Sequence, residues 1–442
     1  MRLTRSGLLR QQDFVRFWLA QTVSQFGSFV TTLALPLLAA ITLDASPFEM
    51  GVLAAAGTLP NLLFGLHVGV WVDRLRRRPI MIAADFGRAA LLLIIPIASL
   101  LDMLSLPLLI AVAFAVGTLT VCFDVSYMSY LPTLVSDEQL IDANSKLEGS
   151  VAIAQVIGPG LAGFLVALIT APFAILVDAV TFVYSGIMVG RIEHPERLPK
   201  PSNEEQLIRR EIGEGLRVVI HHPILRALAG CGSLISLAGN AFLAVYVLYM
   251  KRDLGLSAAE IGFVFAVGGV GAFIGSLLAG PVAKRMGQGR AMIAAQLGFG
   301  ISGLVIPLAV LAPSVALAMV VFAEFAQWLA LLIYFINAMS LRQSITPDAL
   351  RGRVNATNRI ATAGMWPIGA LLGGFMGGLI GLPQTLAATE LILVLPVTWL
   401  LLSPLRRNEI IPVIVPSGLE IADDEQEAIV PTFAPETRPV GD

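Results

Sequence analysis

Six charged side chains stand inside long apolar stretches of this chain, where ionised groups are rare. A carboxylate at membrane depth costs several kcal/mol unless it is paired, solvated or protonated, so each of these groups is a candidate for proton binding or for an ion pair. The carboxylates are Asp85, Asp124, Asp178, Glu324 and Glu390, and Arg88 is the one basic side chain that we count among them.

Arg88 and Asp124 lie at matched depths if both stretches are helical. Arg88 follows Arg78 by ten residues, and Asp124 precedes Ser136 by twelve. At 1.5 Å per residue these are rises of ~15 Å and ~18 Å from the same side. The two stretches are neighbours in sequence, so we expect a structural ion pair between Arg88 and Asp124. The alternative is that Asp124 carries protons.

No grouping typical of an enzyme accompanies these charges. The sequence contains no P-loop, no His-x-x-x-His pair and no Ser/His/Asp set. Cys122 and Cys231 both lie in apolar runs, which indicates small hydrophobes and not a disulfide or metal pair. We therefore expect no enzyme, no cofactor and no metal. The net charge of −2 gives no sign of nucleic-acid binding, because the charges are sorted by location instead of forming one basic face.

The elements that must position these charges are membrane-spanning helices. Of the 442 residues, 56% are hydrophobic and 14% are charged, whereas soluble domains are nearer a quarter charged. Apolar runs repeatedly exceed the ~18 residues that cross a hydrocarbon core of ~30 Å. The first run starts too late and is too long for a cleaved signal peptide. Turns and charges predict twelve spans: 14–43, 48–72, 79–101, 106–134, 143–169, 171–191, 223–250, 257–283, 290–311, 314–341, 355–381 and 385–404.

Basic residues predict the orientation of these spans. They concentrate in the loops that follow spans two, eight and ten, and few occur on the opposite side. The positive-inside rule then places both termini and the long linker in the cytoplasm. We divide the chain into a six-helix bundle over 1–191, a linker with a surface helix over 192–222, a second six-helix bundle over 223–404, and an acidic, Pro-rich tail over 405–442 that we expect to be disordered.

The two halves are internal repeats. Gly69-Val-Trp-Val-Asp73-Arg74 recurs as Gly280-Pro-Val-Ala-Lys284-Arg285, an offset of 211 positions from 69 to 280. The same offset carries Glu49 and Gly51 onto Glu260 and Gly262, and Gly158 and Gly163 onto Gly369 and Gly374. Because each half has an even number of spans, the halves share one orientation, as in transporters with parallel repeats.

The loop after span two carries the most specific motif. Residues 69–78 resemble the signature G-x-x-x-D-R-x-x-R-R of the major facilitator superfamily, which implies an all-α fold of twelve transmembrane helices. Arg76 and Trp71 stand where that signature has a second glycine and a leucine. The resemblance implies a gating loop made of Gly69, Asp73, Arg74, Arg77 and Arg78. The plain alternative is that any cytoplasmic loop of a membrane protein is basic.

Motifs in span five and in neighbouring segments indicate which branch of the superfamily the chain resembles. Residues 154–163, with Gly158, Pro159 and Gly163, resemble the G-x-x-x-G-P-x-x-G-G motif of proton-coupled antiporters, although small-residue helix packing alone produces similar patterns. Residues 83–89, Phe123-Asp124 and residues 134–144 resemble the branch that contains the enterobactin exporter and the macrolide-efflux permeases. This branch implies proton-driven export of drugs or siderophores.

Glu324 is the strongest candidate for proton coupling. It lies about ten residues into span ten, and under the 211 offset its mate is Ala113, so the fold alone does not require it. Asp124 and Asp178 are further candidates, although Asp178 and Glu390 lie on spans expected to face away from the cavity. The resemblance implies a substrate cavity between spans one, four, seven and ten. Its candidate residues are Gln21, Gln25, Phe29, Tyr127, Asn240, Tyr246, Gln327 and Trp328.

The combined prediction is a secondary active exporter in the inner membrane that works by alternating access. Its expected partners are a small-molecule substrate, protons and the lipid bilayer, and we expect a monomer. Two alternatives stay open. One is facilitated or proton-coupled uptake of a metabolite, and the other is a membrane scaffold or sensor without transport.

Overall fold

The computed structural model describes residues 8–72, 74–194, 196, 213 and 215–407. Within this part of the chain, twelve helices are long and apolar enough to cross a membrane. They correspond to the twelve spans expected from the sequence, which confirms the all-α, twelve-helix fold. The tail from 408 onward, most of the linker and Asp73 lie outside the described residues.

The first bundle contains six helices. A helix that begins at one end of the bundle is followed by one that returns, so α1 begins and α6 ends on the same side. We call this side the terminal end and the opposite side the far end. The helices are α1 (Gln12–Ile41), α2 (Pro47–Val72), α3 (Arg77–Leu100), α4 (Leu106–Leu134), α5 (Leu140–Ile169) and α6 (Ala171–Gly190).

The second bundle follows the same plan, but three of its spans are interrupted. Pro307 and Pro367 have no N–H to donate to residues 303 and 363, and α10 and α13 end at those residues. A third break precedes Pro396. The spans are α8 (Pro223–Arg252), α9 (Ala258–Met286), α10 (Gln288–Gly303) with α11 (Val305–Leu308), α12 (Ala316–Ile345), α13 (Asp348–Ala363) with α14 (Met365–Ile380), and α15 (Leu382–Val394) with α16 (Pro396–Leu402).

The repeat is visible in how equivalent helices begin. The Ser257 hydroxyl accepts from the Glu260 N–H, and the Glu260 carboxylate accepts from the Ser257 N–H, which forms a capping box at the start of α9. Ser46 and Glu49 make the same two bonds at the start of α2. Ser257 and Glu260 lie 211 positions after Ser46 and Glu49. Equivalent sequence therefore produces equivalent helix starts.

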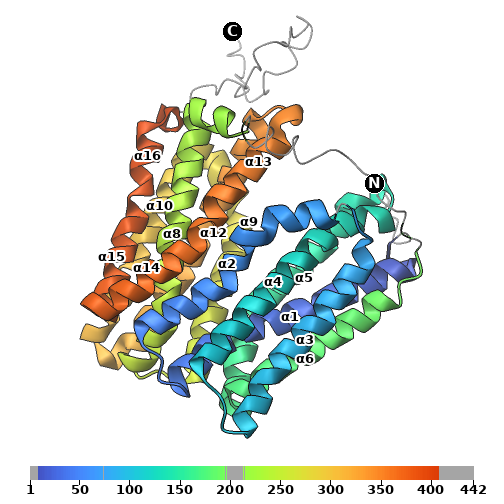
Figure 1. Ribbon diagram of the computed structural model, residues 1–442. Helices are drawn as coiled ribbons and strands as arrows, with labels where there is room; N and C mark the ends of the chain where they lie inside the picture. The colour runs from blue at the N-terminus through green and yellow to red at the C-terminus, as the bar shows by residue number, and fades with distance from the viewer. Residues whose placement is uncertain (1–7, 73, 195, 197–212, 214, 408–442) are drawn as a thin grey trace, which may run out of the picture.

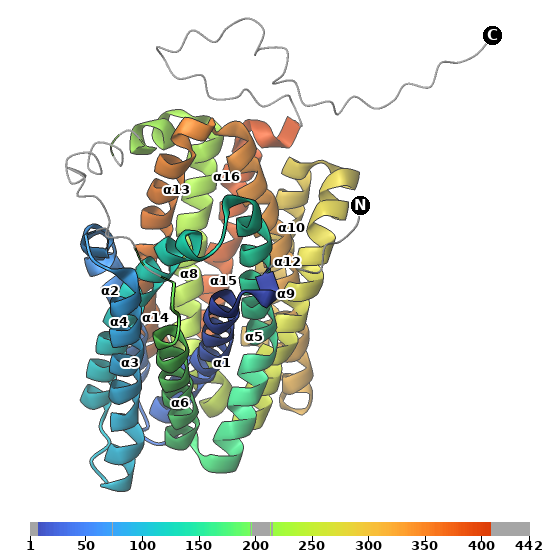
Figure 2. The same cartoon turned by 90° about the vertical axis from the view of Figure 1, so that its right-hand side faces the viewer.

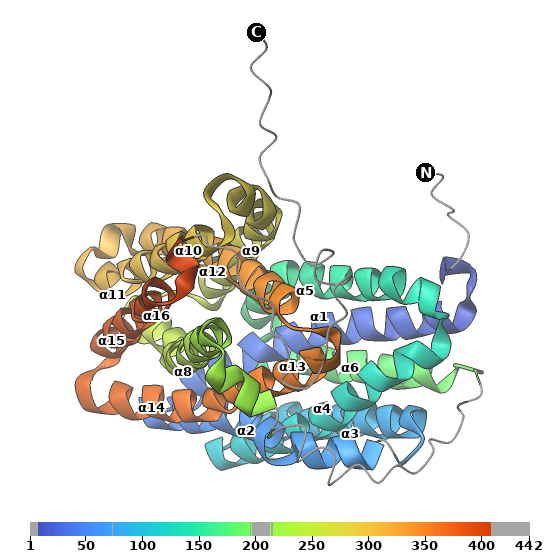
Figure 3. The same cartoon turned by 90° about the horizontal axis from the view of Figure 1, so that it is seen from above.

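The two bundles meet along two helix pairs, α2 with α14 and α5 with α9, which lie side by side when the molecule is seen from above (Figure 3). Glycines allow the close approach. A Cβ on Gly163 would lie 2.6 Å from the Gly262 Cα, and one on Gly51 would lie 2.8 Å from the Gly374 Cα. The offset of 211 relates these pairs to each other, so one contact is built twice.

All four glycines lie near the far end of their helices, and the bundles converge there (Figure 1). Figure 2 shows the first bundle in front of the second. Arg252 of the second bundle also donates to Asp44 of the first across this end. Toward the terminal end the bundles diverge, and residues 215–221 form a helix whose Gly215 packs on the backbone of Arg353. The structure is closed at the far end.

Candidate functional site

A cavity of about 570 Å³ lies between the two bundles. Its volume is in the range of small-molecule sites, ~300–1,000 Å³. Side chains of α1, α2, α4 and α6 line it from the first bundle, and side chains of α8, α9, α13 and α14 line it from the second. Most of its wall is apolar. The charged lining residues in the described part of the chain are Asp124, Asp178 and Arg359.

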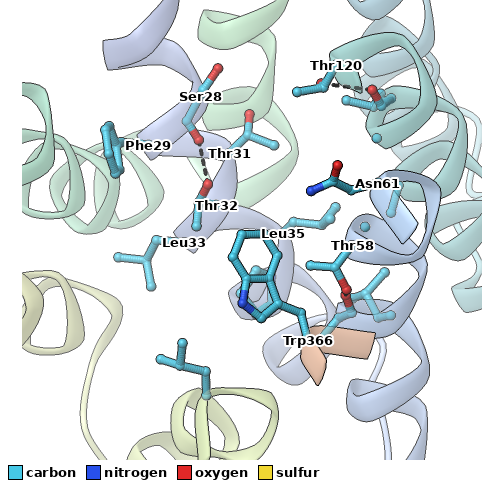
Figure 4. Close-up of a pocket in the computed structure, with 18 of the residues that line it drawn as sticks. Ser28, Phe29, Thr31, Thr32, Leu33, Leu35, Thr58, Asn61, Thr120 and Trp366 are labelled. Carbon is cyan, nitrogen blue, oxygen red and sulfur yellow. Dashed lines mark hydrogen bonds between the residues drawn. The ribbon is translucent and has the colours of Figure 1, made fainter. Parts of the chain in front are cut away.

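Hydroxyl and amide groups follow α1, α2 and α4 along the cavity wall (Figure 4). The Thr32 hydroxyl donates to the Ser28 carbonyl at 2.8 Å, and the Thr120 hydroxyl donates to the Val116 carbonyl at 2.9 Å. These bonds use the donors but leave the hydroxyl lone pairs for a ligand. The Asn61 amide projects into the same space, and Trp366 of α14 faces it from the second bundle. The cavity therefore offers hydrogen bonds within an apolar wall.

Asp124 is exposed to this cavity. It lies ten residues before the end of α4, which places it ~15 Å from the terminal end. Arg88 and Arg359 are the cations that act on its carboxylate. Neither of them forms an ion pair with it among the described residues. Asp124 is thus a cavity carboxylate without a direct partner.

Arg88 has a different partner from the one that we expected. Its guanidinium donates to Asp85, three residues earlier on α3, at 2.5 Å, and Asp85 accepts a second bond from the Ser185 hydroxyl on α6 at 2.8 Å. The rings of Phe123 and Phe182 cover the guanidinium at 4.4 and 4.0 Å. The expected Arg88–Asp124 pair is not formed, because the guanidinium is paired with Asp85 on the same helix.

Asp178 also differs from the expectation that α6 faces away from the cavity. It lines the cavity, although its side chain is only 1% exposed. The Thr181 hydroxyl donates to its carboxylate at 3.1 Å. α6 packs directly against α1, which brings Asp178 beside the cavity wall. Gly27 of α1 makes room for this contact, because a Cβ there would meet the Thr181 and Asp178 side chains.

Glu324 lies inside the second bundle, not on the cavity wall. It is 3% exposed and accepts hydrogen bonds from the Tyr246 hydroxyl and from the Trp328 indole N–H, both at 2.9 Å. Phe265, which lines the cavity, packs edge-on against Tyr246. One aromatic layer therefore separates Glu324 from the cavity.

Gln327, one turn further along α12, belongs to the same interior. It donates to Glu390 of α15 at 2.8 Å. A side chain at Gly303 would collide with both of these groups. In this conformation the polar residues around Glu324 join helices α8, α12 and α15 within one bundle.

The remaining cavity candidates divide into two groups. Phe29 and Asn240 line the cavity as expected. Gln21 is 5% exposed on α1, and Tyr127 stacks on Phe17 with ring centres 5.2 Å apart, so both pack within the first bundle. Gln25 is half-buried on α1 and is not part of the cavity wall described here.

The basic loop after α2 holds its own bundle together. The backbone N–H groups of Arg77 and Arg78, at the start of α3, donate to the carboxylate of Glu196 at 2.6 and 3.2 Å. The Arg78 side chain donates to the carbonyls of Val189, at 3.1 Å, and Gly190 at the end of α6. Arg74 is exposed, and a Cβ on Gly69 would meet nothing within 4 Å. In this conformation the bonds described for the start of α3 go to Glu196 and to the end of α6.

Arg359 is the functional candidate that the sequence interpretation missed. It lies inside the span predicted over 355–381, yet we counted Arg88 as the one internal base. Polar neighbours such as Asn355, Thr357 and Asn358 surround it in sequence and conceal its depth. The available signal was its position, eleven residues after the start of α13.

Comparisons with known proteins find relatives that match most of the chain. A major facilitator family model described as "transmembrane secretion effector" matches residues 5–417. The chain is 27% identical to the multidrug efflux pump Tap of Mycolicibacterium fortuitum over 409 residues, 87% of this chain and 94% of that protein. It is 29% identical to the enterobactin exporter EntS of Shigella boydii over 328 residues, 72% of this chain and 74% of that protein.

The fold is also similar to that of a solved structure. A bacterial homologue of the iron transporter ferroportin, in an inward-facing state, superposes with a TM-score of 0.73. The two chains are 16% identical, and the match covers 90% of this chain and 99% of the other. At this identity the likeness shows the shared fold alone.

Proposed function

The chain belongs to the transmembrane secretion effector family of major facilitator transporters, and from this premise we propose that it exports amphipathic small molecules by alternating access. One observation carries the proposal. A cavity of about 570 Å³, lined by both bundles, lies between them and is closed at the far end by two symmetric glycine contacts. Rocking of the bundles about such a cavity moves a ligand from one side to the other. The names of the relatives Tap and EntS describe exporters.

The distribution of basic residues supports a direction. Arg74, Arg77, Arg78, Lys284 and Arg285 all lie at the terminal end. By the positive-inside rule this end faces the cytoplasm, with both termini, in the inner membrane. The conformation closed at the far end then faces inward and receives its substrate from the cytoplasm or from the inner leaflet.

We propose that the proton gradient drives export by antiport and that Asp124 is the coupling residue. Antiport requires that proton binding and substrate binding disfavour each other, and a group that each occupies in turn achieves this directly. Asp124 is exposed to the cavity and has no ion-pair partner among the described residues. Asp178 is nearly inaccessible, and Glu324 lies behind Phe265 with two hydrogen-bond donors already engaged. Both are therefore weaker candidates than Asp124.

The same geometry supports action as a monomer, because a single chain supplies both sides of the cavity. Uptake or facilitated diffusion would use the same cavity, so the direction of transport decides between these functions. A scaffold without transport has no use for a cavity carboxylate, which costs several kcal/mol at membrane depth.

Proteoliposomes test the proposal. The vesicles contain protein oriented with its terminal end outward, and their interior is acidic. Erythromycin, ethidium, rhodamine 123 and rhodamine 110 are added outside. We expect accumulation of at least one compound above equilibrium, and its loss when a protonophore removes the pH gradient. Asp124→Asn is expected to exchange labelled for unlabelled compound without accumulating it. Equilibration of these compounds without accumulation at any gradient would instead indicate facilitated diffusion.

A further inference from the structure

Arg359 is a cation in the wall of the central cavity. It lies on α13, is exposed, and is the one basic residue among the described residues that line the cavity. Placing a guanidinium at this depth is costly unless a partner compensates its charge. None of the ion pairs formed by the described residues includes Arg359. Its fork of N–H donors is therefore available to a ligand.

Asp124 faces the same cavity at the same depth from the other bundle. It lies ten residues before the end of α4, and Arg359 lies eleven residues after the start of α13, so both are ~15 Å from the terminal end. The two groups interact electrostatically but do not form an ion pair. A negative and a positive group thus border the cavity from opposite bundles, and no ion pair joins them among the described residues.

The internal repeat indicates that helix packing does not require this arginine. Under the offset of 211, the mate of Arg359 is Glu148 on α5, which is also exposed and carries the opposite charge. A residue needed for the packing that both bundles share would be expected to match in type in both halves. Arg359 is also exposed where it lines the cavity. Its position points to a role in binding.

We propose that the cavity selects zwitterionic amphiphiles, whose cationic group binds Asp124 while an anionic group binds Arg359 and the apolar body lies against Trp366 and the aliphatic wall. This rests on the proposed export function and names its substrate class. A purely cationic ligand at Asp124 leaves Arg359 uncompensated, and a purely anionic ligand at Arg359 leaves Asp124 uncompensated. A ligand with both charges compensates both, and its cationic group still competes with a proton at Asp124.

The test uses two dyes that differ in one ester. Rhodamine 110 carries a cationic xanthylium and a carboxylate, and rhodamine 123 is its methyl ester, which retains only the cation. Full-length protein in nanodiscs is titrated with each dye, and binding is followed by fluorescence anisotropy with empty nanodiscs subtracted. A charge-assisted hydrogen bond contributes about tenfold or more to affinity. The wild-type protein should therefore bind rhodamine 110 at least about tenfold more tightly than rhodamine 123.

Three variants isolate the contribution of Arg359. Arg359→Gln should remove the preference for rhodamine 110 and leave rhodamine 123 binding unchanged or tighter. Arg359→Lys retains the charge and should retain most of the preference. Arg290→Gln, at an exposed site outside the cavity, makes the same change in net charge and should behave as wild type.

Several results would overturn the inference. One is that the wild-type protein has no preference for rhodamine 110. Another is that the preference survives in Arg359→Gln. The third is an equal loss of binding of both dyes in that variant, which would make Arg359 a structural residue. Gradient-driven export of rhodamine 123 combined with any of these results would leave the proposed transport function intact.

Discussion

Replacing Gly163 by alanine should shift the transporter away from the conformation described here. Gly163 of α5 contacts Gly262 of α9 where the bundles meet at the far end. An added methyl would lie 2.6 Å from both the Gly262 Cα and the Ala258 carbonyl oxygen. Both obstacles are backbone atoms, so no side-chain rotation relieves the collision. The strain exists only while the far end is closed, because an outward-facing conformation separates these helices.

The size of the shift follows from the cost of overpacking, ~1–3 kcal/mol per extra methyl group in a packed contact. Since 1.36 kcal/mol corresponds to a factor of ten, the population ratio should move about 5- to 150-fold toward the conformation that is open at the far end. The matched control is Gly378→Ala on α14, where an added Cβ would meet nothing within 4 Å. It introduces the same methyl group and should leave the ratio unchanged.

Pulsed electron spin resonance measures this directly. Spin labels at Met103 and Ser314, which are exposed in far-end loops of the two bundles, report the distance across the closed end. The native cysteines Cys122 and Cys231 are first replaced by alanine. Gly163→Ala should add a longer-distance population that Gly378→Ala lacks. Identical distance distributions for the two variants would refute the argument that this contact closes the far end.

Three further variants test other contacts. Asp85→Ala should lower the free energy of unfolding by about 3–5 kcal/mol, because it leaves Arg88 buried without its partner; thermal denaturation should show partial recovery in Asp85→Leu with Arg88→Met. Glu324→Gln should retain gradient-driven export in proteoliposomes, and its loss there would return the coupling role to Glu324. Asp44→Asn should weaken the far-end closure by no more than about 1 kcal/mol, because its bond to Arg252 is exposed and salt screens such pairs. A shift in the spin-label distance that salt does not reduce would contradict this.

The helices and the repeat could be predicted because they depend on local properties. Apolar length decides whether a segment spans the membrane, and charged loops mark its ends. The offset of 211 was exact enough to predict that Gly163 and Gly374 are equivalent. What they contact could not be read from it. Gly163 contacts Gly262 and Gly374 contacts Gly51, and the offset of 211 relates these two partners to each other.

The site was harder to predict because depth along a helix does not give rotation about its axis. Glu324 and Asp124 both lie at membrane depth, yet Asp124 faces the cavity and Glu324 faces α8. Only the packing of neighbouring helices fixes that direction. The family resemblance likewise implies that Asp178 faces away from the cavity, whereas the contact of α6 with α1 places it on the wall.

Ion pairs were difficult for a related reason. Asp85 and Arg88 are three residues apart, so they share one helix face, and this local contact competes with any partner on another helix. Matched depth alone therefore does not identify the partner of Arg88. Arg359 was missed because its polar neighbours resemble a loop, although the helix continues through them to Ala363.

The central claim is that a proton and a substrate occupy Asp124 in turn, and proton release tests it most directly. Rhodamine 123 is added to purified protein in weakly buffered solution at several values between about pH 5 and pH 8, and the released protons are counted with a pH indicator. Competition predicts a release that approaches one proton per bound dye as Asp124 becomes protonated in the dye-free protein. Asp124→Asn should bind dye without releasing protons, and Glu324→Gln should release them as the wild type does. Dye binding without proton release by the wild type across this range, or undiminished release by Asp124→Asn, would contradict the claim.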